Sequence, residues 1–134
     1  MGRLLDVKNL SISFGGIKAV QDLNFHINTG EILALIGPNG SGKSTTVNMI
    51  SGVYIQNTGT IFFDGKEISP KMSIADRAKL GISRTFQTPK PFAHLSVYDN
   101  IYTIALQKNS KAQAAELTDE VLNLTKLYDL KDMK

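Results

Sequence analysis

The sequence contains no cysteine and no tryptophan, and it has only two histidines, His26 and His94. The absence of thiols excludes disulfide bonds, thiolate zinc sites and cysteine nucleophiles, and it is typical of proteins of the cytosol. Neither histidine has a partner at a metal-ligand spacing, so we expect both at the surface or in the core. No stretch of 18 or more apolar residues is present, which predicts no transmembrane helix. Any link to a membrane would then come through a partner protein.

The 134 residues are 42% hydrophobic and 20% charged, which predicts a soluble globular chain of one domain at most. Asp6 follows the N-terminus too closely for a secretory signal peptide, and we expect none. The formal net charge is +3, but the basic residues are scattered along the chain. Because they form no stripe, the sequence does not predict a nucleic-acid partner.

The strongest motif lies at residues 37–44, whose letters GPNGSGKS match the pattern G-x-x-x-x-G-K-S of a phosphate-binding loop. Its glycines allow backbone angles that a Cβ would forbid, so consecutive N–H groups can converge on an anion. Lys43 would supply a cation for the β and γ phosphates of a nucleotide, and the Ser44 hydroxyl would hold the Mg²⁺ that bridges them. The predicted binding residues of the loop are Gly37, Pro38, Asn39, Gly40, Ser41, Gly42, Lys43 and Ser44.

The residues on both sides of this loop support the motif. The apolar run at residues 31–36 predicts a buried parallel strand that leads into the loop. Val47, Met49 and Ile50 predict the apolar face of a short helix after the loop, and Gly52 suits its C-terminal end. The alternative is a glycine-rich turn that binds nothing, which would require a chance match to all four fixed positions.

Alternating apolar residues predict further strands. Residues 4–13 and 19–27 flank Gly15 and Gly16, and they predict an antiparallel pair. Residues 58–65 predict a third strand of the same layer, which ends in the turn sequence Asp-Gly. Residues 82–86 predict another strand that ends before Gln87.

Cap residues mark three helices in the second half of the chain. Residues 73–81 fit a short helix with Ser73 as N-cap, Asp76 at the capping-box position and Gly81 as the stop. Ser96 would cap a second helix, after an irregular loop that contains two prolines. A third helix begins near residue 110, and the members of its apolar stripe are Leu117, Val121, Leu124 and Tyr128.

Three segments in order resemble the N-terminal half of an ATP-binding-cassette (ABC) ATPase: Phe14-Gly15-Gly16, the loop at 37–44, and Arg84-Thr85-Phe86-Gln87. The letters GISRTFQ at 81–87, followed by SVYDNI at 96–101, are similar to the ATPase subunit of bacterial branched-chain amino acid importers. The resemblance covers essentially the whole chain. It implies an α/β P-loop fold with an antiparallel β layer (residues 1–30 and 58–65), a P-loop core (31–57), and the glutamine loop with the start of a helical subdomain (82–134).

The resemblance also implies roles for single residues. Phe14 would stack on adenine, where the family more often has tyrosine, although a core aromatic at a strand end is the alternative. Val20 would pack on the same ring or the ribose, or would be plain core. Thr45 would help to hold the α phosphate at the helix N-terminus. Gln87 would reach Mg²⁺ and the attacking water, which makes it a metal ligand with Ser44 and a catalytic residue with Lys43.

Three parts of the family pattern are not found in these 134 residues. The serine-glycine-glycine signature is missing, no apolar strand ends in Asp-Glu, and no histidine follows His94. Without the strand carboxylate, no general base for the attacking water is evident, so rapid ATP hydrolysis by this chain alone is not expected. We therefore interpret the chain as a fragment of a longer protein, with a natural short nucleotide binder as the alternative.

The resemblance implies that two such ATPase subunits, identical or different, enclose ATP and act on transmembrane permease subunits. The expected location is the cytoplasmic face of the cell membrane, through the permease. One rival is a soluble ABC protein of DNA repair or translation, which would bring long insertions or basic surfaces that the sequence lacks. Another is a P-loop kinase or GTPase, for which we find no guanine-reading or acceptor-binding motif.

Overall fold

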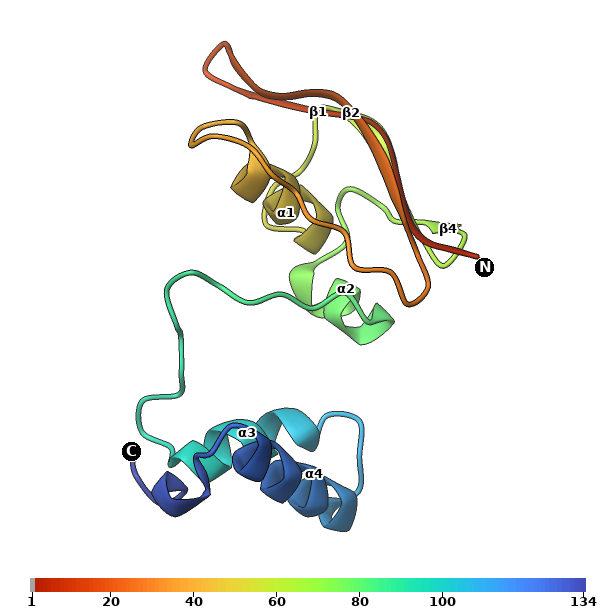
Figure 1. Cartoon of the computed structure of the whole chain (residues 1–134). Helices are drawn as coiled ribbons and strands as arrows, with labels where there is room; N and C mark the ends of the chain where they lie inside the picture. Colours follow the sequence, from red (N-terminus) through yellow and green to blue (C-terminus); the bar gives the residue numbers. More distant parts are fainter. Residues whose placement is uncertain (1) are drawn as a thin grey trace. The chain divides into compact units, whose positions relative to one another are not determined.

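The computed structural model describes residues 2–134, which form two compact units, one ending at Arg84 and the other comprising Thr85–Lys134. Figure 1 shows the elements of both. The first unit contains an antiparallel sheet and the helices α1 (Lys43–Ser51) and α2 (Ile74–Leu80). The second contains α3 (Val97–Ala105), α4 (Lys111–Leu124) and the short 3₁₀ helix η1 (Tyr128–Leu130).

The sheet of the first unit confirms the predicted antiparallel layer. Its strands are β1 (Arg3–Phe14), β2 (Ile17–Asn28), β3 (Thr58–Phe63) and β4 (Lys66–Glu67), in the order β2-β1-β3-β4. All three pairings are antiparallel. The predicted turn between β3 and β4 is present, with φ of 48° at Asp64 and 73° at Gly65. Such positive values at both central residues match the twist of the flanking strands.

Helix α1 packs on one face of this sheet and completes the core. Met49 of α1 is fully buried, as are Leu10 of β1 and Ile61 of β3. Gly52 ends the helix as predicted, with φ of 85° and its N–H bonded to the Met49 carbonyl at 3.2 Å. The sheet therefore supports the helix that follows the glycine-rich loop.

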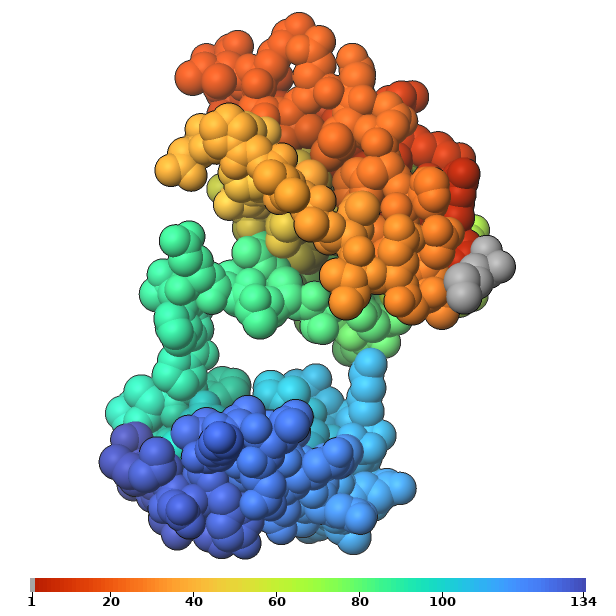
Figure 2. All heavy atoms as spheres, viewed as in Figure 1, coloured from red at the N-terminus to blue at the C-terminus, as the bar shows by residue number. Residues whose placement is uncertain are grey.

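The apolar run at residues 31–36 does not form the buried strand that the sequence predicts. The run is extended, but within residues 2–134 it has no strand partner. Ile32 and Ile36 are 97% and 89% exposed, whereas Leu33 and Leu35 turn inward and are about 42% and 41% exposed. Figure 2 shows this part of the chain, in orange, at the surface of the first unit. A parallel strand needs neighbours to satisfy its backbone groups, and none of the described segments supplies one.

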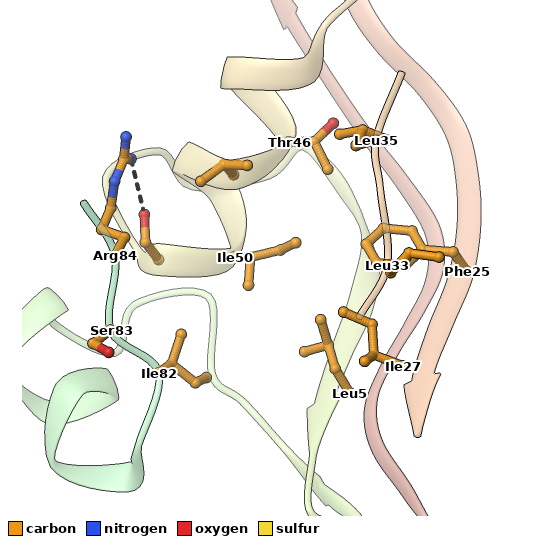
Figure 3. Close-up of a pocket in the computed structure, with 12 residues that line it drawn as sticks. Leu5, Phe25, Ile27, Leu33, Leu35, Thr46, Ile50, Ile82, Ser83 and Arg84 are labelled. Carbon is orange, nitrogen blue, oxygen red and sulfur yellow. Dashed lines mark hydrogen bonds between the residues drawn. The ribbon is translucent and has the colours of Figure 1, made fainter. Parts of the chain in front are cut away.

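Leu33 and Leu35 face an apolar cavity of about 220 Å³ between the sheet and α1 (Figure 3). Phe25 and Ile27 of β2 lie beside these leucines, and Ile50 of α1 faces them across the cavity. The inward side chains thus alternate along the run as in a strand, although the ladder of hydrogen bonds is missing.

Helix α2 confirms its predicted signals, but the strand after it does not form. The Ser73 hydroxyl accepts the Asp76 N–H at 3.1 Å, and Gly81 ends the helix with φ of 113°. Residues 82–86 have no regular structure, so the predicted strand there is wrong among the residues described. Like residues 31–36, this segment has no strand beside it, within the part of the chain that the structure describes, with which to pair.

The second unit is helical. Ser96 and Ser110 cap α3 and α4 as predicted, and Ser110 forms a full capping box with Gln113. The predicted stripe of α4 is wrong, because the helix ends before Tyr128 and buries a different face: its buried residues are Ala114, Thr118 and Leu122. None of the helices in residues 2–134 is long and apolar enough to cross a membrane.

Candidate phosphate-binding site

The segment at residues 37–44 forms a loop that turns sharply into α1. Gly40 and Gly42 have φ of 84° and 89°, the left-handed region that glycine adopts without a steric penalty. A turn closes at its start, where the Ser41 N–H donates to the Pro38 carbonyl at 3.2 Å. The helix begins at Lys43 directly after the second of these glycines. The loop is therefore neither extended nor part of a continuous helix.

The first amides of α1 are available to a ligand. The first helical hydrogen bond runs from the Thr46 N–H to the Gly42 carbonyl at 2.8 Å. Within residues 2–134, no group accepts the N–H of Lys43, Ser44 or Thr45, and no side chain caps the helix. The first turn also carries no acidic residue. Free amides and the positive end of the helix dipole together favour an anion at this position.

The Lys43 side chain folds back over the loop. Its Nζ donates to the carbonyl oxygens of Gly37 and Pro38, at 2.7 Å each. The Ser41 hydroxyl lies 3.5 Å from the same nitrogen. An ammonium held by neutral carbonyls can exchange them for phosphate oxygens, which form stronger charge-assisted hydrogen bonds.

The loop lies close against strand β2. A cavity of about 390 Å³ separates part of the loop from β2, and Lys43 and Val20 are among its lining residues. At Gly42 the approach is closest: a Cβ there would lie 2.5 Å from the Ala19 carbonyl oxygen and 2.9 Å from Val20 Cγ2. Position 42 can therefore hold only glycine in this backbone arrangement.

Phe14 stands at the end of β1, where the hairpin turns into β2. Its ring is 44% exposed, so it is not a core aromatic. Tyr54, which follows α1, contacts it edge to face with ring centroids 5.2 Å apart and an interplanar angle of 67°. Val20, in contrast, is 9% exposed and belongs to the hydrophobic core.

A family model described as "ABC transporter" matches residues 20–134. The chain belongs to the ABC transporter family. The resemblance seen in the sequence is thereby confirmed, and so is the α/β P-loop fold, because solved ABC cassettes align along the whole chain.

Individual ABC relatives differ in the names they carry. The chain is 42% identical over 99 residues to "Probable branched-chain amino acid transport ATP-binding protein LivG" of Archaeoglobus fulgidus, covering 74% of this chain and 38% of the relative. It is 34% identical over 130 residues to "Lipopolysaccharide export system ATP-binding protein LptB" of Escherichia coli K12, covering 97% of this chain and 53% of the relative. The solved ATP-binding cassette MJ1267 aligns with 30% identity and a TM-score of 0.82, over 100% of this chain and 58% of that one. The chain thus spans about half or less of the curated relatives.

The remaining predicted residues of the ABC site occupy two units. Ser44 is exposed and Thr45 half-buried in the first turn of α1, next to the free amides. Gln87 is exposed and belongs to the second unit. The structure therefore brings together residues 37–45 in one loop and helix start, while the role of Gln87 stays a prediction.

Two arginines that hold α1 in place were not predicted from the sequence. Arg77 of α2 is fully buried, and its guanidinium donates to five carbonyl oxygens, among them Met49 at 2.8 Å and Ile50 at 2.9 Å. Burial lowers the pKa of the Arg77 guanidinium. Arg84 donates to the side chains of Asn48 and Ser51 on α1. Arginine is rarely buried, so composition and spacing gave no signal for the contacts of Arg77.

Proposed function

We propose that the chain is the nucleotide-binding part of a longer ATPase subunit that drives an ABC importer. The observation that carries this proposal is the set of unpaired amides at the start of α1, enclosed by a loop with Lys43 folded over it. The ligand of this loop would be the triphosphate of Mg-ATP. The chain itself would bind, while hydrolysis would need parts of the family pattern that its sequence does not contain.

The roles of the residues follow from their chemistry. The amides of Gly40 and of residues 42–45 would donate to the phosphate oxygens, and Lys43 would exchange its two carbonyl acceptors for the β and γ phosphates. Ser44 and Gln87 would hold Mg²⁺ by a hydroxyl and a neutral amide oxygen. When bound, Mg²⁺ would neutralise charge between the β and γ phosphates. Thr45 would contact the α phosphate.

Phe14 would recognise the adenine base. Its exposed ring offers an apolar surface, and the edge-on contact of Tyr54 holds the ring in place. Stacking of a base on an aromatic side chain contributes about 1 to 3 kcal/mol. Because every base has a π face, this contact would strengthen binding more than it would select adenine.

For the solute, we propose a branched-chain amino acid. The support is the 42% identity to the relative named LivG, together with the segments at 81–87 and 96–101. The likeness to LptB spans more of the chain at lower identity. The comparisons therefore support an ABC transporter more strongly than they support a particular solute. The partners would be a second ATPase subunit and a membrane permease, which would hold the subunit at the cytoplasmic face of the membrane.

Uptake of radiolabelled leucine in cells lacking the gene tests the solute. We expect uptake to be lost, to return with the wild-type gene, and not to return with Lys43→Ala. Normal leucine uptake in the deleted cells would contradict the amino acid assignment. Purification tests the class of protein: a membrane permease should copurify with the tagged subunit, whereas copurifying nucleic acid would favour an ABC protein of DNA repair or translation.

A further inference from the structure

Arg84 is the last residue of the first unit, and its side chain reaches α1. The guanidinium Nη1 donates to Asn48 Oδ1 and, at 3.2 Å, to Ser51 Oγ. Figure 3 shows Arg84 extended toward the helix, with a hydrogen bond drawn as a dashed line. Ser51 is only 4% exposed, so this end of the contact lies inside the protein. Hydrogen bonds from a charged donor in such a place are stronger than those in water.

The two acceptors lie on the face of α1 that also carries Ser44. Ser44, Asn48 and Ser51 are spaced by four and then three residues, which places them in one row along a helix. Ser44 and Asn48 are about 6 Å apart along the axis, because each residue rises about 1.5 Å. Arg84 therefore binds the helix about one turn away from its proposed metal ligand.

The segment that leads to Arg84 is fixed to the same helix at its other end. Arg77 donates to the last carbonyls of α1, and its own carbonyl accepts the Ile82 N–H at 3.0 Å. Residues 77–84 are thus attached to α1 at both ends. The chain leaves the first unit directly after the second attachment.

Gln87 follows Arg84 by three residues. Three extended residues span at most about 11 Å, so the position of Arg84 limits where the Gln87 backbone can lie. We propose that Arg84 is a positioning residue, which ties the start of the Gln87 segment to the phosphate-binding helix so that movements of the helix reach Gln87. The proposal rests on the proposed function, since it deepens the part assigned to Gln87.

The test uses the full-length ATPase assembled with its permease in proteoliposomes. Arg84→Met removes the donors and keeps an unbranched side chain. The matched control is Arg3→Met, the same replacement at an arginine of β1 that is 56% exposed and bonds to Asp6. We expect Arg84→Met to keep the Kd for Mg-ATP within about twofold, since the loop contacts remain. The kcat for ATP should fall about tenfold or more through misplacement of Gln87. Arg3→Met should change neither.

Two further variants separate positioning from a general loss of stability. Asn48→Ala removes one acceptor and leaves the Arg84 side chain unchanged, so it should also lower kcat. The double variant should be no slower than Arg84→Met alone, because Asn48→Ala removes a contact that Arg84→Met has already removed. Arg84→Lys keeps a cationic donor and should restore part of kcat. If Arg84→Met does not fold, Asn48→Ala is judged by the same criteria.

The positioning role would be overturned if Arg84→Met left kcat unchanged, or if the losses of kcat were additive in the double variant. It would also be overturned if Arg84→Met lowered the affinity for Mg-ATP, kcat and Tm together. Failure of the proposed function would look different, since Lys43→Ala would then retain Mg-ATP binding. Loss of binding in Lys43→Ala combined with normal kcat in Arg84→Met would refute the positioning role alone.

Discussion

Replacement of Gly42 by alanine should damage the phosphate-binding loop far more than the same replacement at Gly40. Both glycines have positive φ, 84° at Gly40 and 89° at Gly42, so alanine costs about 1 to 2 kcal/mol of backbone strain at either position. At Gly40 the added Cβ meets no atom within 4 Å. At Gly42 it would lie 2.5 Å from the Ala19 carbonyl oxygen, where ordinary contacts begin at 3.4 Å. The loop and β2 would have to separate by about 0.9 Å, which adds about 1 to 3 kcal/mol as in other overpacked sites.

The two variants can be compared by denaturant unfolding and by calorimetric titration with Mg-ATP. We expect Gly42→Ala to lose about 2 to 5 kcal/mol of unfolding free energy, and Gly40→Ala about 1 to 2 kcal/mol. Because a shift of about 1 Å in a binding group can cost a hundredfold, Gly42→Ala should weaken Mg-ATP by about that factor. Gly40→Ala should weaken it by less than about tenfold. Equal losses of stability and affinity in the two variants would refute the role assigned to the contact with β2.

Four further replacements test other parts of the account. Lys43→Ala should abolish Mg-ATP binding in a titration, because it removes the phosphate cation; unchanged affinity would contradict this role. Phe14→Ala should weaken ATP by about 1 to 3 kcal/mol and spare inorganic triphosphate, and equal loss for both ligands would argue against stacking. Gln87→Ala in the full-length protein should leave ATP binding nearly intact and reduce solute transport, so normal uptake would speak against its assignment. Arg77→Met should lower the unfolding free energy by about 3 to 5 kcal/mol, since five carbonyls lose the charged donor of a fully buried side chain; a change below about 1 kcal/mol in denaturant unfolding would contradict that reasoning.

Features that depend on neighbouring residues were predictable from the sequence. Ser73, Ser96 and Ser110 cap their helices by a hydroxyl that accepts an amide three residues on, so four letters suffice to recognise each cap. The turn at Asp64 and Gly65 is equally local. The glycine-rich loop was predictable for the same reason, because its shape depends on its own glycines.

Features that depend on distant partners were predictable only in part: β3 pairs with β1 as expected, but two other predicted strands do not form. The runs at 31–36 and 82–86 have the composition of strands, but a strand forms only beside another one. The buried face of α4 was also missed, since Ala114 and Thr118 are less apolar than the exposed Leu124. In each case the outcome was set by what packs against the segment, which a local pattern does not contain.

The central claim is that the amides at the start of α1 bind the triphosphate of Mg-ATP. Its most direct test is to titrate the ¹⁵N-labelled 134-residue chain with Mg-ATP and follow the amide resonances by NMR. The account predicts saturable shifts at Gly40, Gly42, Lys43, Ser44 and Thr45, which Lys43→Ala should remove. Saturable binding that leaves those five amides unmoved, or no binding by a chain with a well-dispersed spectrum, would contradict it.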